Sequence, residues 1–269
     1  PVQFHKDGKR VYLDSNKGDD VDLSRLLLLD VATGATEFVE SDPDKEVDFG
    51  SAVFDGETKE LMATAYIGDR VRIYPKTKRA KEDLQRIQKQ LPPGNIGLGS
   101  ATKDMRYQIV AIQSDLEPGA AYIYDRKSGK FALQYRLRPK LQSDALAPMK
   151  AVQYKTRDGL TIHAFLTLPR GVEAKNLPTV IHPHGGPWAR DNWGYSPYPQ
   201  FLANRGYAVL QLNFRGSTGY GKKFLNAGNH EWGIGAMQHD ITDAVQYLIA
   251  QGIADPKRIA LFGGSYGGY

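Results

Sequence analysis

The sequence predicts a chain in two parts, a partial β-propeller of about three blades over residues 1–145 and an α/β unit over residues 146–269. Two observations favour this fold class. Similar polar turns return at a regular interval in the first part, and compact apolar segments alternate with helical patterns in the second. The length of 269 residues also exceeds the roughly 150 residues of a typical domain, so it suits two domains.

The repeat in the first part is marked by aspartates in polar turns. Asp7, Asp55 and Asp104 stand 48 and then 49 positions apart. A second turn sequence, at residues 30–34, returns two periods later at residues 125–129. A period near 48 residues with several short strands is typical of a four-stranded propeller blade. A plain antiparallel sheet with similar turns is the alternative.

About three such repeats fit into the first part, whereas a closed propeller needs at least about four blades. We therefore expect the chain to begin inside a larger domain. Within the second repeat, Leu84, Ile87 and Leu91 recur at helical spacing among basic residues. This pattern predicts an amphipathic helix over residues 77–91 with a solvated basic face. A phosphate-binding surface is the alternative, but no aromatic residues interleave these charges.

Composition excludes several classes of protein. The chain contains no Cys, which excludes disulfide frameworks, Cys-based zinc sites and thiol nucleophiles. The net charge of +5 is modest and scattered, and the longest aliphatic run covers only residues 26–29. A bilayer span needs about 20 apolar residues, so we expect neither a membrane nor a nucleic-acid partner. The cellular compartment stays open, because a signal peptide removed ahead of Pro1 would leave no trace.

The second part follows a linker at residues 138–144 and opens with a hairpin signal at Asp158-Gly159. Three later segments are compact apolar runs of the kind buried in a parallel sheet: residues 178–182, 207–212 and 259–262. Two segments between them have helical patterns: residues 198–204 and 240–251. Strand, helix, strand, helix, strand is the doubly wound order, so a parallel sheet is predicted.

The reactive chemistry is predicted at residues 263–267, Gly-Gly-Ser-Tyr-Gly, directly after the last predicted strand. A serine at a sharp strand-to-helix turn has a strained backbone, and tiny neighbours at Gly263 and Gly267 avoid clashes there. Ser265 is therefore the predicted nucleophile, because its hydroxyl would stand above the sheet where a base and a carbonyl can reach it. The nucleophile elbow indicates an incomplete α/β-hydrolase fold.

A second motif, His-Pro-His-Gly-Gly-Pro at residues 182–187, follows an earlier predicted strand. Acyl transfer needs two N–H donors aimed at the developing oxyanion. The N–H of Tyr266 is the natural first donor. Pro187 has no N–H, so the second donor is Gly185 or Gly186, and Gly186 is favoured.

The two histidines of this motif, His182 and His184, raise the alternative of a metal site, because alternate strand residues share a face. No carboxylate or third histidine stands near them in the sequence, so a role in the oxyanion loop and in packing is favoured. We expect no metal and no other cofactor.

Three sequence strings together carry a family resemblance. They are His-Gly-Gly-Pro at residues 184–187, Asn-Phe-Arg-Gly-Ser-Thr-Gly-Tyr-Gly at residues 213–221 and Gly-Gly-Ser-Tyr-Gly-Gly-Tyr at residues 263–269. In their order and separation, residues 151–269 resemble the catalytic domain of the prolyl oligopeptidase family of serine peptidases. The tyrosine after the serine is more similar to the acylaminoacyl-peptidase and dipeptidyl-peptidase branches. The resemblance implies a β-propeller ahead of the hydrolase domain, which agrees with the repeats.

The resemblance also implies a catalytic triad in the order Ser, Asp, His, yet all six histidines precede Ser265. The triad acid and base are therefore expected beyond Tyr269. The chain is expected to be an internal piece of a longer enzyme, and this piece ends at the nucleophile elbow. By itself it is expected to be inactive and to associate through an exposed sheet edge. His184 is the one candidate for a substitute base, but its loop is expected to face the oxyanion.

Other polar residues of the second part are expected to have structural roles. Arg215 is predicted to lie in a turn-rich loop held by its own hydrogen bonds. Asp240 and Asp243 suit the first turn of a helix, where their charge complements the helix dipole. Three rings are expected to pack beneath the loop ahead of that helix: His230, Trp232 and His239.

Three functions follow as alternatives. The first is a serine peptidase of acylaminoacyl, dipeptidyl or oligopeptidase type, which cleaves short peptides through Ser265. The second is a carboxylesterase, for which the serine motif alone would serve equally well, although the repeat domain argues against it. The third is a propeller-based binding protein with a vestigial hydrolase. Dipeptidyl specificity would need acidic residues for the substrate's amino terminus, and the sequence has no adjacent Glu pair.

Overall fold

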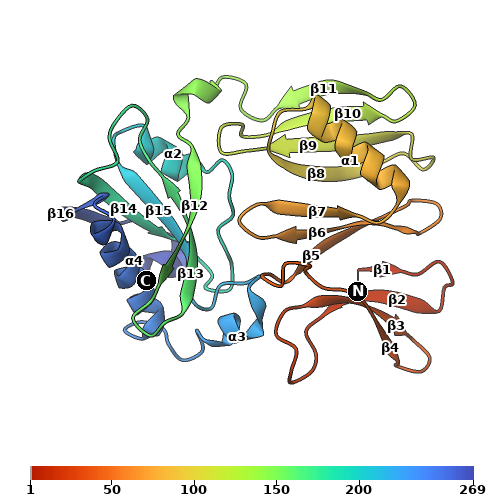
Figure 1. The fold of residues 1–269 in the computed structure, drawn as a ribbon, viewed down its shortest axis with the longest axis horizontal. Coiled ribbons are helices and arrows are strands. Elements are labelled where there is room, and N and C mark those ends of the chain that lie inside the picture. The colour runs from red at the N-terminus through yellow and green to blue at the C-terminus, as the bar shows by residue number, and fades with distance from the viewer. Residues whose placement is uncertain (1) are drawn as a thin grey trace. The chain divides into compact units, whose positions relative to one another are not determined.

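The computed structural model describes residues 2–269 (Figure 1). The chain divides into two compact units. The first holds residues 2–114, 119–139 and 219–222, and the second holds residues 115–118, 140–218 and 223–269. Among the described residues, no helix combines the length and the apolar character that a membrane crossing requires.

The first unit consists of three antiparallel sheets and one helix (Figure 1). The first sheet contains, in order, β1 (Gln3–Phe4), β2 (Arg10–Ser15), β3 (Arg25–Asp30) and β4 (Thr36–Glu40). The second contains β5 (Phe49–Phe54), β6 (Leu61–Ile67) and β7 (Val71–Pro75). The third contains β8 (Asn95–Ala101), β9 (Tyr107–Gln113), β10 (Ala120–Asp125) and β11 (Lys130–Arg136). Each strand pairs with its neighbour in sequence, as in a propeller blade.

The predicted repeat corresponds to the same turn of each sheet. Asp7, Asp55 and Asp104 lie between the first and second strands of their sheets. In each turn the Oδ1 atom of the aspartate accepts backbone N–H groups two or three positions further on. The carboxylate thereby closes an Asx turn, which is why aspartate recurs at this position. The period of about 48 residues is confirmed.

The prediction of consecutive four-stranded sheets is right for the first and third sheets and wrong for the second, which has three strands. After β7 the chain enters α1 (Lys78–Gln90), so the predicted helix is confirmed. Thr77 caps it, because its Oγ1 accepts the N–H of Ala80 at 3.1 Å. The segment is rich in Lys, Gln and Arg, which favour a helix over a fourth strand. Ile87 is buried in a core with residues of β9 and β10.

The second unit is built on a five-stranded sheet of order β12-β13-β15-β14-β16. Its strands are β12 (Met149–Lys155), β13 (Thr161–Thr167), β14 (Leu177–Pro183), β15 (Ala208–Asn213) and β16 (Ala254–Leu261). The β12–β13 and β13–β15 pairs are antiparallel, whereas β15, β14 and β16 are parallel. All of β15 is buried, as expected for a strand covered on both faces.

Helices connect the parallel strands. They are α2 (Pro197–Ala203), α3 (Gly221–Asn226) and α4 (Ala236–Ala250). Two 3-10 turns lie outside these connections: η1 (Ser143–Ala145) precedes β12, and η2 (Ser265–Gly268) follows β16. The prediction that α4 begins at Asp240 is wrong by one turn. The Oε2 atom of Glu231 accepts the N–H of Ala236 at 2.8 Å and starts the helix there. Asp240 therefore lies inside the helix, where it is fully buried.

Candidate active site

Ser265 is the first residue of η2, which follows β16 after residues 262–264. Its backbone φ is +55°, in the left-handed region that residues other than glycine rarely adopt. Such a conformation persists only where the surrounding structure imposes it, and it is a recurrent feature of functional sites. A serine held in this way after a parallel strand has the geometry of a nucleophile elbow.

Two glycines around Ser265 have no room for a side chain. A Cβ atom on Gly263 would lie 2.1 Å from the carbonyl oxygen of Gly267. A Cβ atom on Gly267 would lie 2.2 Å from the carbonyl oxygen of Pro183, at the end of β14. The turn is therefore compressed between the ends of two neighbouring strands, and glycine is required at both positions.

Substituting Gly267 tests this compression. We expect Gly267→Ala to destabilise the second unit by about 1–3 kcal/mol, as overpacking does, and to lower any activity that depends on the turn. Urea unfolding of the 269-residue chain, followed by tryptophan fluorescence, measures the loss. Gly264→Ala is the matched control, because a Cβ atom on Gly264 meets nothing within 4 Å. Equal stabilities of the two variants would contradict the account.

The His-Gly-Gly-Pro loop, which follows β14, lies directly against Ser265. A Cβ atom on Gly185 would lie 3.2 Å from the Cβ of Ser265 and 3.1 Å from the carbonyl oxygen of Gly264. Gly186 is exposed and has a φ of +132°, which requires glycine. The structure thus brings together two motifs that are about 80 residues apart in the sequence, as the parallel pairing of β14 with β16 dictates.

Tyr266 follows Ser265 at the start of η2, and its side chain points into the unit. Its ring packs against that of Phe214 with the centroids 5.9 Å apart. Its hydroxyl lies 3.4 Å from the Sδ of Met237. These contacts hold Tyr266 in place, and with it the backbone N–H that was predicted as the first oxyanion donor.

His184 is not positioned as a base for Ser265. Its Nε2 lies 2.9 Å from the Oγ of Ser217, and its Nδ1 lies 2.8 Å from the carbonyl oxygen of Gly185. Burial lowers the pKa of the imidazole below its usual value. Within residues 2–269, Ser265 has no hydrogen bond to a histidine ring, and no three metal-ligating side chains gather as a metal site would need.

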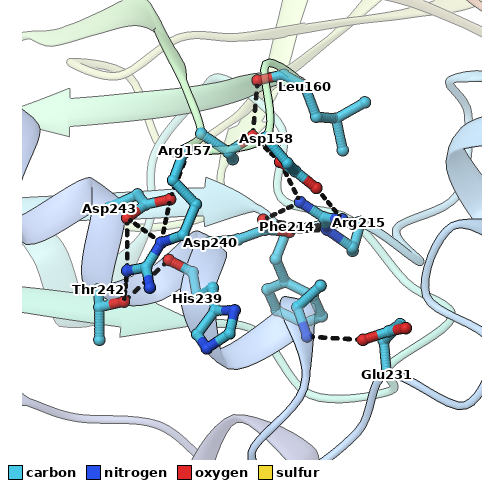
Figure 2. A network of polar contacts seen from close by, with 12 residues as sticks. Arg157, Asp158, Leu160, Phe214, Arg215, Glu231, His239, Asp240, Thr242 and Asp243 are labelled. Carbon is cyan, nitrogen blue, oxygen red and sulfur yellow. Dashed lines mark hydrogen bonds and ion pairs between the residues drawn. The ribbon is translucent and has the colours of Figure 1, made fainter.

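The prediction that the loop of Arg215 is held by its own hydrogen bonds is right in part. The N–H and the Oγ of Ser217 donate to the carbonyl oxygen of Phe214 at 3.0 and 2.6 Å. Arg215 itself forms ion pairs with two aspartates outside the loop (Figure 2). Arg215 is only 7% exposed. Its guanidinium donates to Asp240 of α4 at 2.8 and 3.0 Å, and to Asp158 of the β12–β13 turn at 2.8 and 2.9 Å. The Arg215 backbone N–H also donates to Asp240 at 2.8 Å.

The same network corrects the roles of the two aspartates of α4. Neither lies in the first turn of the helix. Asp243 pairs with the half-exposed Arg157 at 2.8 Å (Figure 2). The Arg215 guanidinium holds the pKa of the Asp158 carboxyl well below its usual range, so this carboxylate stays ionised at neutral pH. The network ties the Asn-Phe-Arg-Gly-Ser segment to α4 and to the first hairpin of the unit.

The rings predicted to pack beneath the loop ahead of α4 do not all do so. Trp232 is 49% exposed, and His230 is exposed as well, so their prediction is wrong, whereas His239 is half-buried. Because α4 starts earlier, Met237 lies in its first turn and is only 2% exposed. The Met237 side chain packs beside Gly216, in the loop that carries Arg215. The exposed Trp232 ring makes an edge contact with Trp188, at 6.1 Å between centroids.

One buried carboxyl in the second unit was not anticipated from the sequence. Asp191 accepts a hydrogen bond from Gln211 Nε2 at 2.9 Å through its Oδ1, while its Oδ2 is buried without a partner. The side chain of Asn213 bonds to both backbone groups of Asp191. The Asp191 N–H donates to Asn213 Oδ1 at 2.7 Å, and the Asp191 carbonyl oxygen accepts from Asn213 Nδ2 at 3.0 Å. Burial raises the pKa of Asp191 to about 7.

This shift predicts a pH dependence of stability. The folded state keeps the Asp191 proton up to about pH 7, whereas the unfolded chain releases it near pH 4, so stability falls as the pH rises between these values. We expect Asp191→Asn, which cannot ionise, to gain on the order of 3 kcal/mol relative to the parent chain between pH 5 and pH 8. Urea midpoints at the two pH values measure it. Asp144→Asn, at an exposed site, is the control, and an equal gain there would contradict the assignment.

Comparison with known proteins supports the predicted resemblance. Residues 193–269 match the model of the prolyl oligopeptidase family. Dipeptidyl aminopeptidase BIII of Pseudoxanthomonas mexicana is 40% identical over 272 residues, which cover 98% of this chain and 38% of that protein. Dipeptidyl peptidase family member 6 of Caenorhabditis elegans is 34% identical, over 100% of this chain and 39% of that protein. The chain therefore spans about two-fifths of the length of these two relatives.

Solved structures give the fold. A puromycin-hydrolyzing peptidase of Mycobacterium tuberculosis superposes with a TM-score of 0.75 at 22% identity, over 98% of this chain and 40% of that one. Dipeptidyl peptidase 4 of Porphyromonas gingivalis superposes with a TM-score of 0.70 at 19% identity, over 100% of this chain and 38% of that one. The predicted fold class, propeller blades followed by an α/β-hydrolase unit, is confirmed.

Proposed function

We propose that the protein containing this chain is a serine peptidase that hydrolyses short peptides through an acyl-enzyme on Ser265. The observation that carries the proposal is the left-handed backbone of Ser265 directly against the His-Gly-Gly-Pro loop. Residues 1–145 serve as a partial propeller of about three blades, and residues 146–269 as the first part of the hydrolase domain.

In this mechanism the Ser265 hydroxyl attacks the peptide carbonyl, and its proton passes to a base. The N–H groups of Gly186 and Tyr266 donate to the oxyanion of the tetrahedral intermediate. No histidine among residues 2–269 is hydrogen-bonded to the Ser265 hydroxyl. The chain spans about two-fifths of its relatives, so we place the base and its carboxylate partner outside these 269 residues.

The substrate class is proposed from the relatives. The two relatives described above, which match nearly the whole chain, are named dipeptidyl aminopeptidase BIII and dipeptidyl peptidase family member 6. These names favour removal of dipeptides from a free amino terminus. An acylamino-acid-releasing enzyme of Sus scrofa, 35% identical over 44% of this chain and 16% of that protein, supports acylated peptides as the second candidate. The edge strand β16, followed by the exposed Phe262, supports self-association of the isolated chain.

Three chromogenic substrates, assayed with the full-length protein, separate the alternatives: a dipeptide p-nitroanilide with a free amino terminus, an acetyl-amino-acid p-nitroanilide and a short-chain p-nitrophenyl ester. We expect the dipeptide anilide to be cleaved with the highest kcat/KM. Preference for the acetylated anilide would favour the acylaminoacyl type. Hydrolysis of the ester alone would indicate a carboxylesterase, and no hydrolysis would favour a binding protein.

A further inference from the structure

Two buried oxygen atoms of the second unit have no hydrogen-bond partner, and they belong to side chains that are bonded to each other. Gln211 of β15 donates from Nε2 to the Oδ1 of Asp191 at 2.9 Å. The other oxygen of each pair, Asp191 Oδ2 and Gln211 Oε1, is buried without a partner among the described residues. Buried polar groups are nearly always hydrogen-bonded, so these two acceptors need an explanation.

One proton satisfies both oxygen atoms. A carboxylate oxygen and an amide oxygen only accept, so Asp191 Oδ2 and Gln211 Oε1 cannot bond to each other while Asp191 is ionised. A proton on Oδ2 makes the carboxyl a donor, and Gln211 Oε1 is the acceptor that lacks a donor. The two planar groups then share a ring of two hydrogen bonds, from Nε2 to Oδ1 and from Oδ2 to Oε1. This ring is an acid–amide pair.

The surroundings of Asp191 favour its protonated form. Burial raises the pKa of Asp191 to about 7, although the bond from Gln211 and the charge of the neighbouring Arg190 oppose this shift. The side chains of β15 that bond to Asp191 are uncharged, and these residues, Gln211 and Asn213, are only 4% and 0% exposed. A hydrogen bond donated by the protonated carboxyl favours the neutral form further.

Asp191 lies in the loop that begins with the His-Gly-Gly-Pro motif, five residues after Gly186. The backbone of this loop is attached to β15 and to the segment after it. The Thr218 N–H donates to the Ala189 carbonyl oxygen at 3.0 Å, and the Asn213 side chain bonds to both backbone groups of Asp191. The acid–amide pair adds an attachment through the side chain, so the loop is held at its backbone and at Asp191 together.

We propose that Asp191 is a neutral carboxylic acid paired with Gln211, and that it is a positioning residue for the loop that carries the Gly186 N–H. The effect on catalysis rests on the proposed function, whereas the acid–amide pair rests on the contacts of Asp191 alone. A loop attached to β15 holds the oxyanion donor in place before the substrate arrives. Ionisation of Asp191 would remove the proton that joins Oδ2 to Oε1 and open the side-chain attachment.

Two substitutions of Asp191 in the full-length protein test the positioning role. In Asp191→Asn the amide can donate to Gln211 Oε1 and accept from Gln211 Nε2, so both bonds are kept. Asp191→Leu has a similar size and offers neither bond. We expect Asp191→Leu to lower kcat for a dipeptide p-nitroanilide by about 10-fold to 100-fold, below the full loss of an oxyanion donor, with KM changed less than about twofold. Asp191→Asn should recover most of the kcat that Asp191→Leu loses.

A high-resolution crystal structure of the wild-type protein at about pH 6, below the pKa of about 7, gives a readout that does not depend on the variants folding. We expect Asp191 Oδ2 to lie about 2.7 Å from Gln211 Oε1, with no water between them. The infrared spectrum at the same pH should contain the C=O stretching band of a protonated carboxyl, and Asp191→Asn should lack this band.

A water molecule that bridges the two oxygen atoms would overturn the inference, as would a spectrum without that band. Equal kcat values for Asp191→Leu and the wild type would overturn the positioning role. A wild-type protein that shows the acid–amide pair but does not cleave any of the peptide anilides would instead overturn the proposed function.

Discussion

Ser265→Ala in the full-length protein is expected to lower kcat by on the order of a millionfold, as the loss of a nucleophile does in a comparable serine peptidase. The physical reason is that the chain offers no alternative nucleophile at the turn, since it contains no cysteine and the neighbouring positions are glycine and tyrosine. The measurement is kcat for a dipeptide p-nitroanilide at saturating substrate, with circular dichroism to verify that the variant is folded.

The matched control is Ser128→Ala, which removes a serine hydroxyl from an exposed turn between β10 and β11. This variant should keep the wild-type kcat. Activity of Ser265→Ala above about one per cent of the wild-type value would show that another group attacks the substrate.

Asp240→Ala is expected to destabilise the second unit by about 3–5 kcal/mol, because it leaves the buried guanidinium of Arg215 without its main partner. Asp240 has no exposed side-chain surface, and Arg215 keeps only 8% of its own. The three tryptophans of the chain, Trp188, Trp193 and Trp232, all lie in the second unit. Their fluorescence during urea unfolding of the 269-residue chain therefore reports the stability of this unit.

Asp243→Ala is the matched control, since it removes a carboxylate from the same helix. Its partner Arg157 is 53% exposed, so water replaces the lost contact and the loss of stability should be much smaller. Equal losses in the two variants would contradict the view that the buried pair between α4 and the Arg215 loop dominates the network.

Features set by local hydrogen bonds could be predicted from the sequence. The Asp7 and Asp55 turns close on backbone groups two or three residues away, so the repeat shows in the sequence itself. The cap of α1 at Thr77 and the close approach of Gly263 to Gly267 are local as well. The nucleophile elbow could therefore be proposed before its geometry was known.

Features set by distant partners could not be predicted. Arg215 pairs with Asp158 and Asp240, which are 57 and 25 residues away, so its sequence context indicated only a turn. The side chain of Glu231 accepts the N–H of Ala236 from outside the apolar helical pattern. The helix α4 therefore begins one turn before the pattern that was used to predict it. The burial of Asp191 depends on the packing of β15 behind it, and no local pattern marks a carboxyl that loses its solvent in this way.

The most direct test of the central claim, that Ser265 is the nucleophile, is mass spectrometry of the full-length protein inactivated by a fluorophosphonate. Trypsin cleaves after Arg258, so Ser265 lies in the peptide that begins at Ile259. The account predicts one phosphonyl group per chain, attached to Ser265, with inactivation proportional to labelling. Complete inactivation with the Ile259 peptide unmodified, or an adduct on another residue, would contradict it.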